Sequence, residues 1–244
     1  MGLLLRKAIF DQAPRTMAQR LRAACIAAYR LEENSGDRAD STPNATTLTD
    51  NNTVTSNTGK IGTAGQFTAA SSEYLSSTSS IFNRGDTSWT QTCWVYADTL
   101  PALSVISGKD NGAADRAYLL YHQIVATNSR FRVAVMDGGS TAWIAVADTF
   151  GVPSTATWYF LAAGHDAVAN EVWISVNNGA LDTTATSAGA GDSAASFMMG
   201  SLNALATTFW DGRIDAWHFF NKRLSGAELT YLYNSGNGRE YPFA

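Results

Sequence analysis

Paired carboxylates are the side chains that would cleave a glycosidic bond, and this chain does not place them together. Retaining hydrolysis needs two carboxyl groups about 5–5.5 Å apart, a separation that alternate residues of one strand provide because they share a face. Asp211 and Asp215 are four residues apart, but Arg213 stands between them. No glutamate has a second carboxylate at spacing two and four on an expected strand; the glutamates are Glu32, Glu33, Glu73, Glu171, Glu228 and Glu240. The sequence therefore argues against a glycosidase, and we expect no catalytic residues.

Other catalytic and metal-binding patterns are also missing from the sequence. The three histidines, His122, His165 and His218, have no Cys or His at the spacing of metal ligands, and the chain has no G-x-S-x-G nucleophile motif. Its two cysteines, Cys25 and Cys93, are too few for a disulfide scaffold. Both lie in apolar, strand-like runs, so we expect buried free thiols, with a Cys25–Cys93 disulfide as the alternative.

Asp215 lies inside the apolar run RIDAWHFFN, where alternation would place it on one face with Trp217 and Phe219. A buried carboxylate without partners costs several kcal/mol, roughly, so Asp215 must have them. We interpret it as a structural carboxylate that accepts hydrogen bonds from backbone N–H groups, with the loop 36–44 as one source. The alternative is a Ca²⁺ ion, the one cofactor considered, held by Asp215, Asp40 and loop carbonyls in a shell of about six to eight oxygens.

Four aromatic residues form the candidate glycan-binding set, because sugar sites combine aromatic faces with a few polar groups. Trp143 follows the turn DGGST, Trp210 precedes the last strand, and Tyr118 and Tyr121 lie in the run AYLLYH. We expect these four side chains at the surface. The alternative for each is packing in the core or at its rim.

A dozen short, strand-like runs separated by turn-rich segments follow residue 24. This pattern predicts an all-β sandwich of two antiparallel sheets. We see no change of composition that would divide residues 24–244, so we expect a single domain. After the last strand, LSGAELTYLYNSG predicts a short helix with Ser225 as N-cap and Glu228 completing a capping box.

The segment 1–23 is expected to be a basic, partly helical arm outside this domain. Met17, Leu21 and Ala24 would share one helical face. Residues 1–30 hold six basic residues against one acidic residue, whereas the whole chain carries a net charge of −4. Such an arm can dock on an acidic surface, for which we single out the three arginines Arg15, Arg20 and Arg22. The alternative is a solvated helix face.

The start of the chain has too short and too charged an apolar run for a secretory signal, and no run is long enough to span a membrane. We therefore expect a protein that is retained in the cytosol or released as part of a particle, without membrane insertion.

Five segments resemble laminin G-like, concanavalin A-like jelly-roll domains when taken in their order along the chain. CIAAYRLEENSGDRADSTPN is similar to the opening strand and loop, and TGKIGTAGQFTAASSEYLS to the second hairpin. SWTQTCWVYAD resembles the Trp-bearing strand, WYFLAAGHDAVANEVWISVNNG the long hairpin, and FWDGRIDAWHFFNKRLSGAELTYLYNSGNG the closing strand and helix. The resemblance covers roughly residues 24–240, and is strongest to single-domain versions from tailed phages and environmental bacteria. It implies a jelly-roll that serves as a binding scaffold, a fold that does not itself determine function.

We expect a non-catalytic attachment protein. The first hypothesis is a virion surface component, such as a capsid decoration, fibre or tail protein, whose arm docks on capsid or tail proteins and whose jelly roll faces outward. The alternative is a bacterial carbohydrate-binding module or adhesin, at the cell surface or secreted. A glycoside hydrolase is the third and least favoured hypothesis. Under the first two we expect cell-surface glycans as partners, a homo-oligomer, and no direct contact with nucleic acid.

Overall fold

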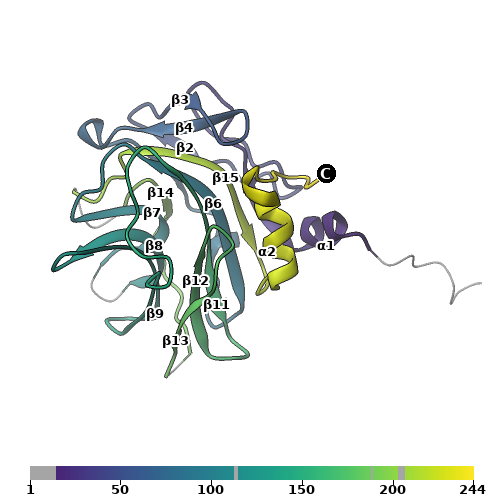
Figure 1. Ribbon diagram of the computed structural model, residues 1–244, viewed down its shortest axis with the longest axis vertical. Coiled ribbons are helices and arrows are strands. Elements are labelled where there is room, and N and C mark those ends of the chain that lie inside the picture. The colour runs from purple at the N-terminus through teal and green to yellow at the C-terminus, as the bar shows by residue number, and fades with distance from the viewer. Residues whose placement is uncertain (1–14, 113–114, 188, 203–206) are drawn as a thin grey trace, which may run out of the picture.

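Two antiparallel β-sheets pack face to face and form the body of the protein (Figure 1). The computed structural model describes residues 15–112, 115–187, 189–202 and 207–244. The eight-stranded sheet has the order β13-β12-β11-β6-β15-β4-β3, with β1 also paired to β15, and the seven-stranded sheet has the order β10-β9-β8-β7-β14-β5-β2. The predicted two-sheet sandwich is therefore confirmed.

Most strands follow the predicted runs, but three short strands, β2, β3 and β13, were not predicted. The eight-stranded sheet consists of β1 (Cys25–Tyr29), β3 (Thr55–Thr58), β4 (Thr63–Phe67), β6 (Trp89–Ala97), β11 (Trp158–Asp166), β12 (Glu171–Val176), β13 (Asp182–Ala185) and β15 (Gly212–Phe220). The seven-stranded sheet consists of β2 (Thr49–Asn51), β5 (Tyr74–Ser77), β7 (Leu103–Asp110), β8 (Arg116–Val125), β9 (Asn128–Gly138), β10 (Ala142–Val146) and β14 (Phe197–Met199). Short 3₁₀ turns lie at Ala69–Ser71, Ser80–Phe82 and Asn234–Gly236.

An aromatic core fills the space between the sheets. Trp217 and Phe219 of β15 stack with ring centroids 5.6 Å apart, and Trp217 approaches Phe197 of the facing sheet at 5.1 Å. The Trp217 indole also donates to the Ser107 hydroxyl on β7 at 3.3 Å. Because these contacts join both sheets, β15 anchors the sandwich.

Two short helices cover the outer face of the eight-stranded sheet (Figure 1). Helix α1 (Met17–Ala24) begins at Thr16 and helix α2 (Gly226–Tyr233) at Ser225, each with a capping box. The capping box of α2 confirms the pair predicted from sequence, and α2 ends at Asn234, which adopts a left-handed conformation. Among the described residues, no helix has both the length and the apolar character needed to cross a membrane.

Helix α1 packs on the body of the protein. Leu21 is fully buried and Ala24 nearly so, in one cluster with Leu229 and Leu232 of α2. The predicted helical face is confirmed, but the expectation that the segment 1–23 lies outside the domain is wrong for residues 17–23. The chain also passes directly from Ala24 into β1, which leaves no linker there. Residues 1–14 lie outside the described residues.

Cys25 and Cys93 are free, buried thiols. Cys25 belongs to the cluster beneath the helices, whereas Cys93 belongs to the core between the sheets. The two side chains therefore lie on opposite faces of one sheet, which explains why they do not form a disulfide.

Candidate functional site

The outer face of the seven-stranded sheet carries the candidate site. Its side chains form rows across neighbouring strands, because cross-strand partners lie on the same face. In one row Val105 pairs with Tyr121, and Tyr121 with Arg132. In the next row Leu119 pairs with Ala134, and Ala134 with Ile144.

These rows enclose an apolar groove with a volume of about 220 Å³. Helices α1 and α2 and the C-terminal segment pack on the outer face of the eight-stranded sheet. No described helix packs on this groove. The lining side chains are largely buried, with Tyr121 6% and Leu119 7% exposed, so the groove is a cleft rather than an open face. An apolar cleft on a sheet is a candidate binding site. The groove is lined by Leu103, Val105, Arg116, Leu119, Tyr121, Gln123, Ala134, Met136, Ala142, Ile144 and Leu202.

A glycine lets the groove form next to β7. Gly108 lies opposite Leu119 in the register, and a Cβ atom at Gly108 would approach both the Leu119 side chain and the Tyr118 carbonyl oxygen to 2.5 Å. The missing side chain therefore leaves room for Leu119 to lie across β7.

A few polar groups accompany the apolar lining. Arg116 donates from Nε to the buried carboxylate of Asp110 at 2.9 Å, so its guanidinium is held in place. Burial raises the pKa of the Tyr121 phenol, while the positive charges of Arg132 and Arg116 act in the opposite direction. The described lining residues thus offer one aromatic ring, the Arg116 guanidinium and the Gln123 amide, and none of them is a carboxylate.

Only Tyr121 of the four predicted aromatic residues lies in this groove. Tyr118 points the other way, into the core, and donates from its hydroxyl to the Phe82 carbonyl at 3.1 Å. Trp210 is completely buried in the same core. Trp143 is 8% exposed, and its indole lies 3.3 Å from the Ser187 hydroxyl. The expectation that these side chains lie at the surface is therefore wrong, because each of the four is buried.

The apolar residues of the groove were not singled out from the sequence. The run RAYLLYHQIV is apolar on both faces, since Leu119 and Tyr121 alternate with the core residues Tyr118 and Leu120. A strand apolar on both faces lies beneath a further layer or a ligand. That signal was present, but the sequence does not show which of the two sheets the helices cover.

Asp215 is a structural carboxylate, as predicted, but its partners and its face differ from the prediction. Its Oδ2 accepts hydrogen bonds from the Lys60 and Ile61 backbone N–H groups at 2.7 and 2.8 Å, not from the loop 36–44. A β-bulge shifts the register between Asp215 and His218. Because of the bulge, Asp215 lies opposite Trp94 on the helix-covered side, while Trp217 stays in the core.

The residues proposed for calcium do not fit that ion. Both oxygens of Asp40 accept hydrogen bonds, from the backbone N–H groups of Ala28, Thr42 and Thr46 and from the Thr42 hydroxyl. N–H groups directed at a carboxylate occupy the lone pairs that a cation would need. The described residues contain no group of three or more His, Cys, Asp or Glu side chains that could hold a metal ion.

Removal of divalent cations is accordingly expected to leave the stability unchanged. A ligand that binds only the folded state raises the melting temperature by mass action. We expect the same melting temperature, within about 1 °C, in 5 mM EDTA and in 5 mM CaCl₂. A rise of several degrees in calcium would contradict the assignment of Asp40 and Asp215 to hydrogen bonds within the protein.

Comparison with protein families places this sandwich among known folds. The family model described as the concanavalin A-like lectin/glucanases superfamily matches residues 67–230, about two-thirds of the chain. The chain belongs to this superfamily. A search of curated protein sequences found no match.

Several solved protein domains have a fold similar to that of this chain. Domain 4 of the extracellular GH43 arabinanase AbnA from Geobacillus stearothermophilus, solved in complex with arabinotriose, is 20% identical, with a TM-score of 0.64. The alignment covers 88% of this chain and 98% of that domain. The binding domain of botulinum neurotoxin serotype D is 12% identical, with a TM-score of 0.67, and is covered over 52% of its length and 88% of this chain. At these identities, the likeness is one of fold.

Proposed function

We propose that this concanavalin A-like chain is a non-catalytic glycan-binding domain whose ligand lies in the groove around Tyr121. The observation that carries the proposal is the apolar groove on the outer side of the seven-stranded sheet, with one aromatic ring and a few polar groups. Apolar surface with a small number of oriented polar groups is the composition that sugar-binding sites use. The arabinotriose complex of the structurally similar arabinanase domain adds support from the fold.

The absence of carboxylates from the described lining residues supports a binding role over hydrolysis. Both retaining and inverting glycosidases use a pair of carboxyl groups beside the scissile bond. We expect no release of reducing ends from any polysaccharide that the protein binds. Sustained turnover by the purified protein would contradict the non-catalytic assignment.

The groove is tested by removing its aromatic ring. A glycan array identifies the ligand, and calorimetry measures its affinity. We expect Tyr121→Ala to weaken binding at least tenfold, equivalent to about 1.4 kcal/mol, because it removes the ring on which the sugar packs. Tyr96→Ala is the matched control, because Tyr96 is a half-buried tyrosine on the other sheet, where its ring contacts that of Trp158 at a tilt.

A second variant fills the groove instead of enlarging it. Ala142 is half-buried in the lining, so Ala142→Phe places a ring in the ligand's volume without opening a cavity in the core. We expect the same loss of affinity with little change in melting temperature. Unchanged affinity in both Tyr121→Ala and Ala142→Phe would remove the groove from the proposal.

Attachment to a larger assembly is the second candidate function, and a virion surface is one such assembly. The arginines Arg15, Arg20 and Arg22 are exposed on or beside α1, and within the described chain none of them has a carboxylate within 4.0 Å. Such a surface fits an acidic partner protein. If this function is right, we expect capsid or tail genes beside this gene. We also expect the double variant Arg15→Glu, Arg22→Glu to release the protein from particles. Neighbouring genes for polysaccharide breakdown would favour a secreted or cell-surface module.

A further inference from the structure

Arginines of β8 and β9 flank the groove around Tyr121, and two of them already have acidic partners. Arg116 donates from Nε to the Asp110 carboxylate at 2.9 Å. Arg130 donates from Nε to the Asp148 carboxylate at 3.1 Å. The positive charge of both guanidinium groups is therefore balanced within the chain, and a bound anion would have to compete with an aspartate.

Arg132 of β9 has no such partner. Among the described residues, no carboxylate lies within 4.0 Å of its guanidinium. Its Nε atom is buried and has no hydrogen-bond partner in the same part of the chain. A guanidinium group can only donate hydrogen bonds, and a buried donor that stays unpaired costs free energy. The half-buried Arg132 side chain is therefore suited to receive an oxygen acceptor from a ligand.

The strand register places Arg132 at the rim of the groove. It lies opposite Tyr121 of β8, and Ala134, two residues further along β9, is on the same face. Arg132 also pairs with Val146 of β10, which makes Ile144 its diagonal neighbour. Tyr121, Ala134 and Ile144 all line the groove. Arg132 is thus bordered by lining residues, although it is not itself one of them.

The charge of Arg132 acts on the aromatic ring of the groove. Burial raises the pKa of the Tyr121 phenol, and the Arg132 charge opposes this effect more strongly than the Arg116 charge does. A sugar that packs on the Tyr121 ring would therefore place its substituents beside an unpaired guanidinium. A carboxylate substituent can accept two parallel hydrogen bonds from that group, and such charge-assisted bonds are stronger than those to a neutral hydroxyl group.

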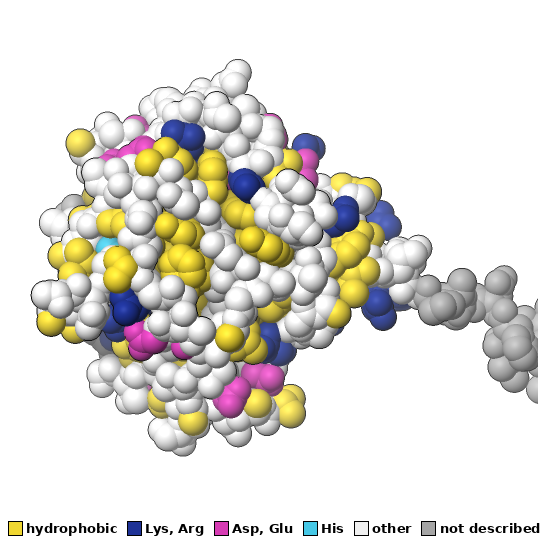
Figure 2. Space-filling view, in the orientation of Figure 1, with side chains coloured by type: hydrophobic (Ala, Val, Ile, Leu, Met, Phe, Trp, Pro, Cys, Tyr) yellow, Lys and Arg dark blue, Asp and Glu magenta, His cyan; other side chains and the backbone are white. Residues whose placement is uncertain are grey.

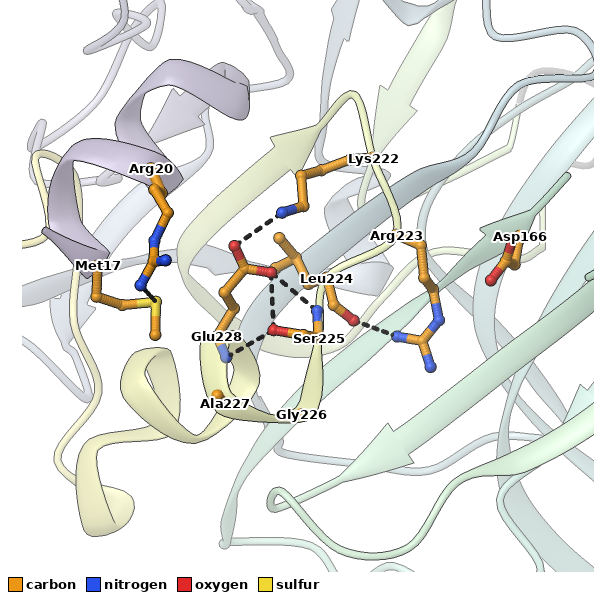
Figure 3. A pocket seen from close by; sticks show the side chains of 10 residues that line it. All are labelled: Met17, Arg20, Asp166, Lys222, Arg223, Leu224, Ser225, Gly226, Ala227 and Glu228. Atoms are coloured by element: carbon orange, nitrogen blue, oxygen red, sulfur yellow. Dashed lines mark hydrogen bonds and ion pairs between the residues drawn. The ribbon is translucent and has the colours of Figure 1, made fainter. Parts of the chain in front are cut away.

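Other positive charge lies on the opposite side of the sandwich, where Figure 2 shows Lys and Arg side chains around α1. A cleft of about 630 Å³ is present there between α1 and α2. Figure 3 shows Arg20 on one side of the first turn of α2 and Arg223 on the other, so one anionic group cannot contact both. Both carboxylate oxygens of Glu228 already accept hydrogen bonds, from Lys222 and Ser225. This cleft does not bring free groups together as the rim of the groove does.

We propose that the groove binds an acidic sugar and that Arg132 receives the carboxylate of that sugar at the rim. This inference rests on the proposed glycan-binding function and names the class of ligand. The sugar ring packs on Tyr121 and the apolar lining, while its carboxylate accepts hydrogen bonds from the Arg132 guanidinium. Arg132 thereby selects carboxylate-bearing sugars over neutral sugars of the same shape.

The test begins with the full chain on a glycan array that holds each oligosaccharide in neutral, carboxylated and sulfated forms. We expect the carboxylated forms to bind more tightly than their neutral counterparts. Calorimetry then compares the carboxylated oligosaccharide that binds best with its methyl ester, which keeps the shape and removes the charge. We expect the ester to bind the wild-type protein more weakly, by about tenfold or more.

Variants of Arg132 separate a contact with the ligand from a structural role. We expect Arg132→Gln to weaken binding of the carboxylated oligosaccharide by about tenfold or more and to leave the affinity for the ester unchanged. A purely structural role would lower both affinities alike. Arg132→Lys keeps the charge but not the planar fork, so we expect a smaller loss. Arg130→Gln is the matched control, because Arg130 is on the same strand and face but already pairs with Asp148.

Equal affinity of the wild-type protein for the carboxylated oligosaccharide and its ester would overturn this proposal, as would equal losses from Arg132→Gln and Arg130→Gln. Tighter binding of the sulfated forms, lost in Arg132→Gln, would overturn the assignment of a carboxylate. If neutral glycans bind in a Tyr121-dependent manner and no acidic preference is found, only the role of Arg132 fails. If Tyr121→Ala leaves all binding unchanged, the groove is not the site and this inference fails with it.

Discussion

Replacement of Trp217 by alanine is expected to lower the free energy of unfolding by about 4 kcal/mol. Trp217 is fully buried and contacts aromatic rings from both sheets, Phe219 on its own strand and Phe197 on the facing sheet. Its removal leaves a cavity between the sheets and deprives the Ser107 hydroxyl of the indole donor. Urea denaturation at pH 7, followed by circular dichroism, measures the effect.

Trp158→Ala is the matched control, because Trp158 is a half-buried tryptophan at the start of β11. We expect it to cost about 1 kcal/mol, since less apolar surface is lost from the folded state. If Trp217→Ala does not fold, Trp217→Phe retains most of the ring and is expected to cost about 1–2 kcal/mol. A loss below about 1 kcal/mol for Trp217→Ala would contradict the description of β15 as the centre of the core.

Replacement of Asp215 by asparagine is expected to change how stability depends on pH. Burial raises the pKa of Asp215 to about 7, against the opposing effect of the Ile61 and Lys60 N–H groups. In the unfolded chain the same carboxyl titrates near about 3.9. Between these values the folded protein holds a proton that the unfolded chain releases, so the wild-type protein loses stability as the pH rises from about 4 to about 7.

Asparagine does not titrate, and its side-chain oxygen can still accept from both N–H groups. The stability of Asp215→Asn relative to wild type should therefore rise with pH across this window, by an amount on the order of 3 kcal/mol. Urea denaturation of both proteins at pH 4, 5.5 and 7.5 gives the difference. Parallel profiles for the two proteins would show that Asp215 does not carry this linkage.

Asp137→Asn provides a control of the opposite sign. Asp137 is exposed, and hydrogen bonds from the Thr141 side chain and the Gly139 N–H lower the pKa of its carboxyl. Its contribution to stability is present above its unfolded pKa and is lost as the pH falls through its folded pKa. The difference in free energy of unfolding between Asp137→Asn and wild type should therefore disappear at low pH, where the corresponding difference for Asp215→Asn is also smallest. Unlike the difference for Asp215→Asn, it should not increase between pH 5.5 and 7.5.

Local rules predicted most of the secondary structure, but not the short strands β2, β3 and β13. The cap at Ser225 with Glu228 needs only neighbouring residues, and alternation along each strand identified the sandwich. The face of Asp215 was not predictable, because a bulge at Asp215 and Ala216 breaks the alternation on which the prediction depended. The left-handed backbone at Ala216 has no residue-type signal, since alanine rarely adopts it.

The candidate site was harder to predict than the fold. Tyr118 and Tyr121 are three residues apart on one strand and so point to opposite faces, one to the core and one to the groove. The sequence alone does not show which sheet carries the groove, because that depends on where α1, α2 and the C-terminal segment pack. Trp210 lies beside turn residues yet is fully buried, since the chain there enters β15 at the centre of its sheet.

An NMR titration of the ¹⁵N-labelled protein with the neutral glycan that binds best on the array tests the central claim most directly. We predict that the shifted amide resonances belong to β7, β8, β9 and β10, with Leu119, Tyr121 and Ile144 among the largest changes. Shifts confined to the helix-covered side or to the edge loops, with these strands unaffected, would contradict the assignment of the groove as the glycan site.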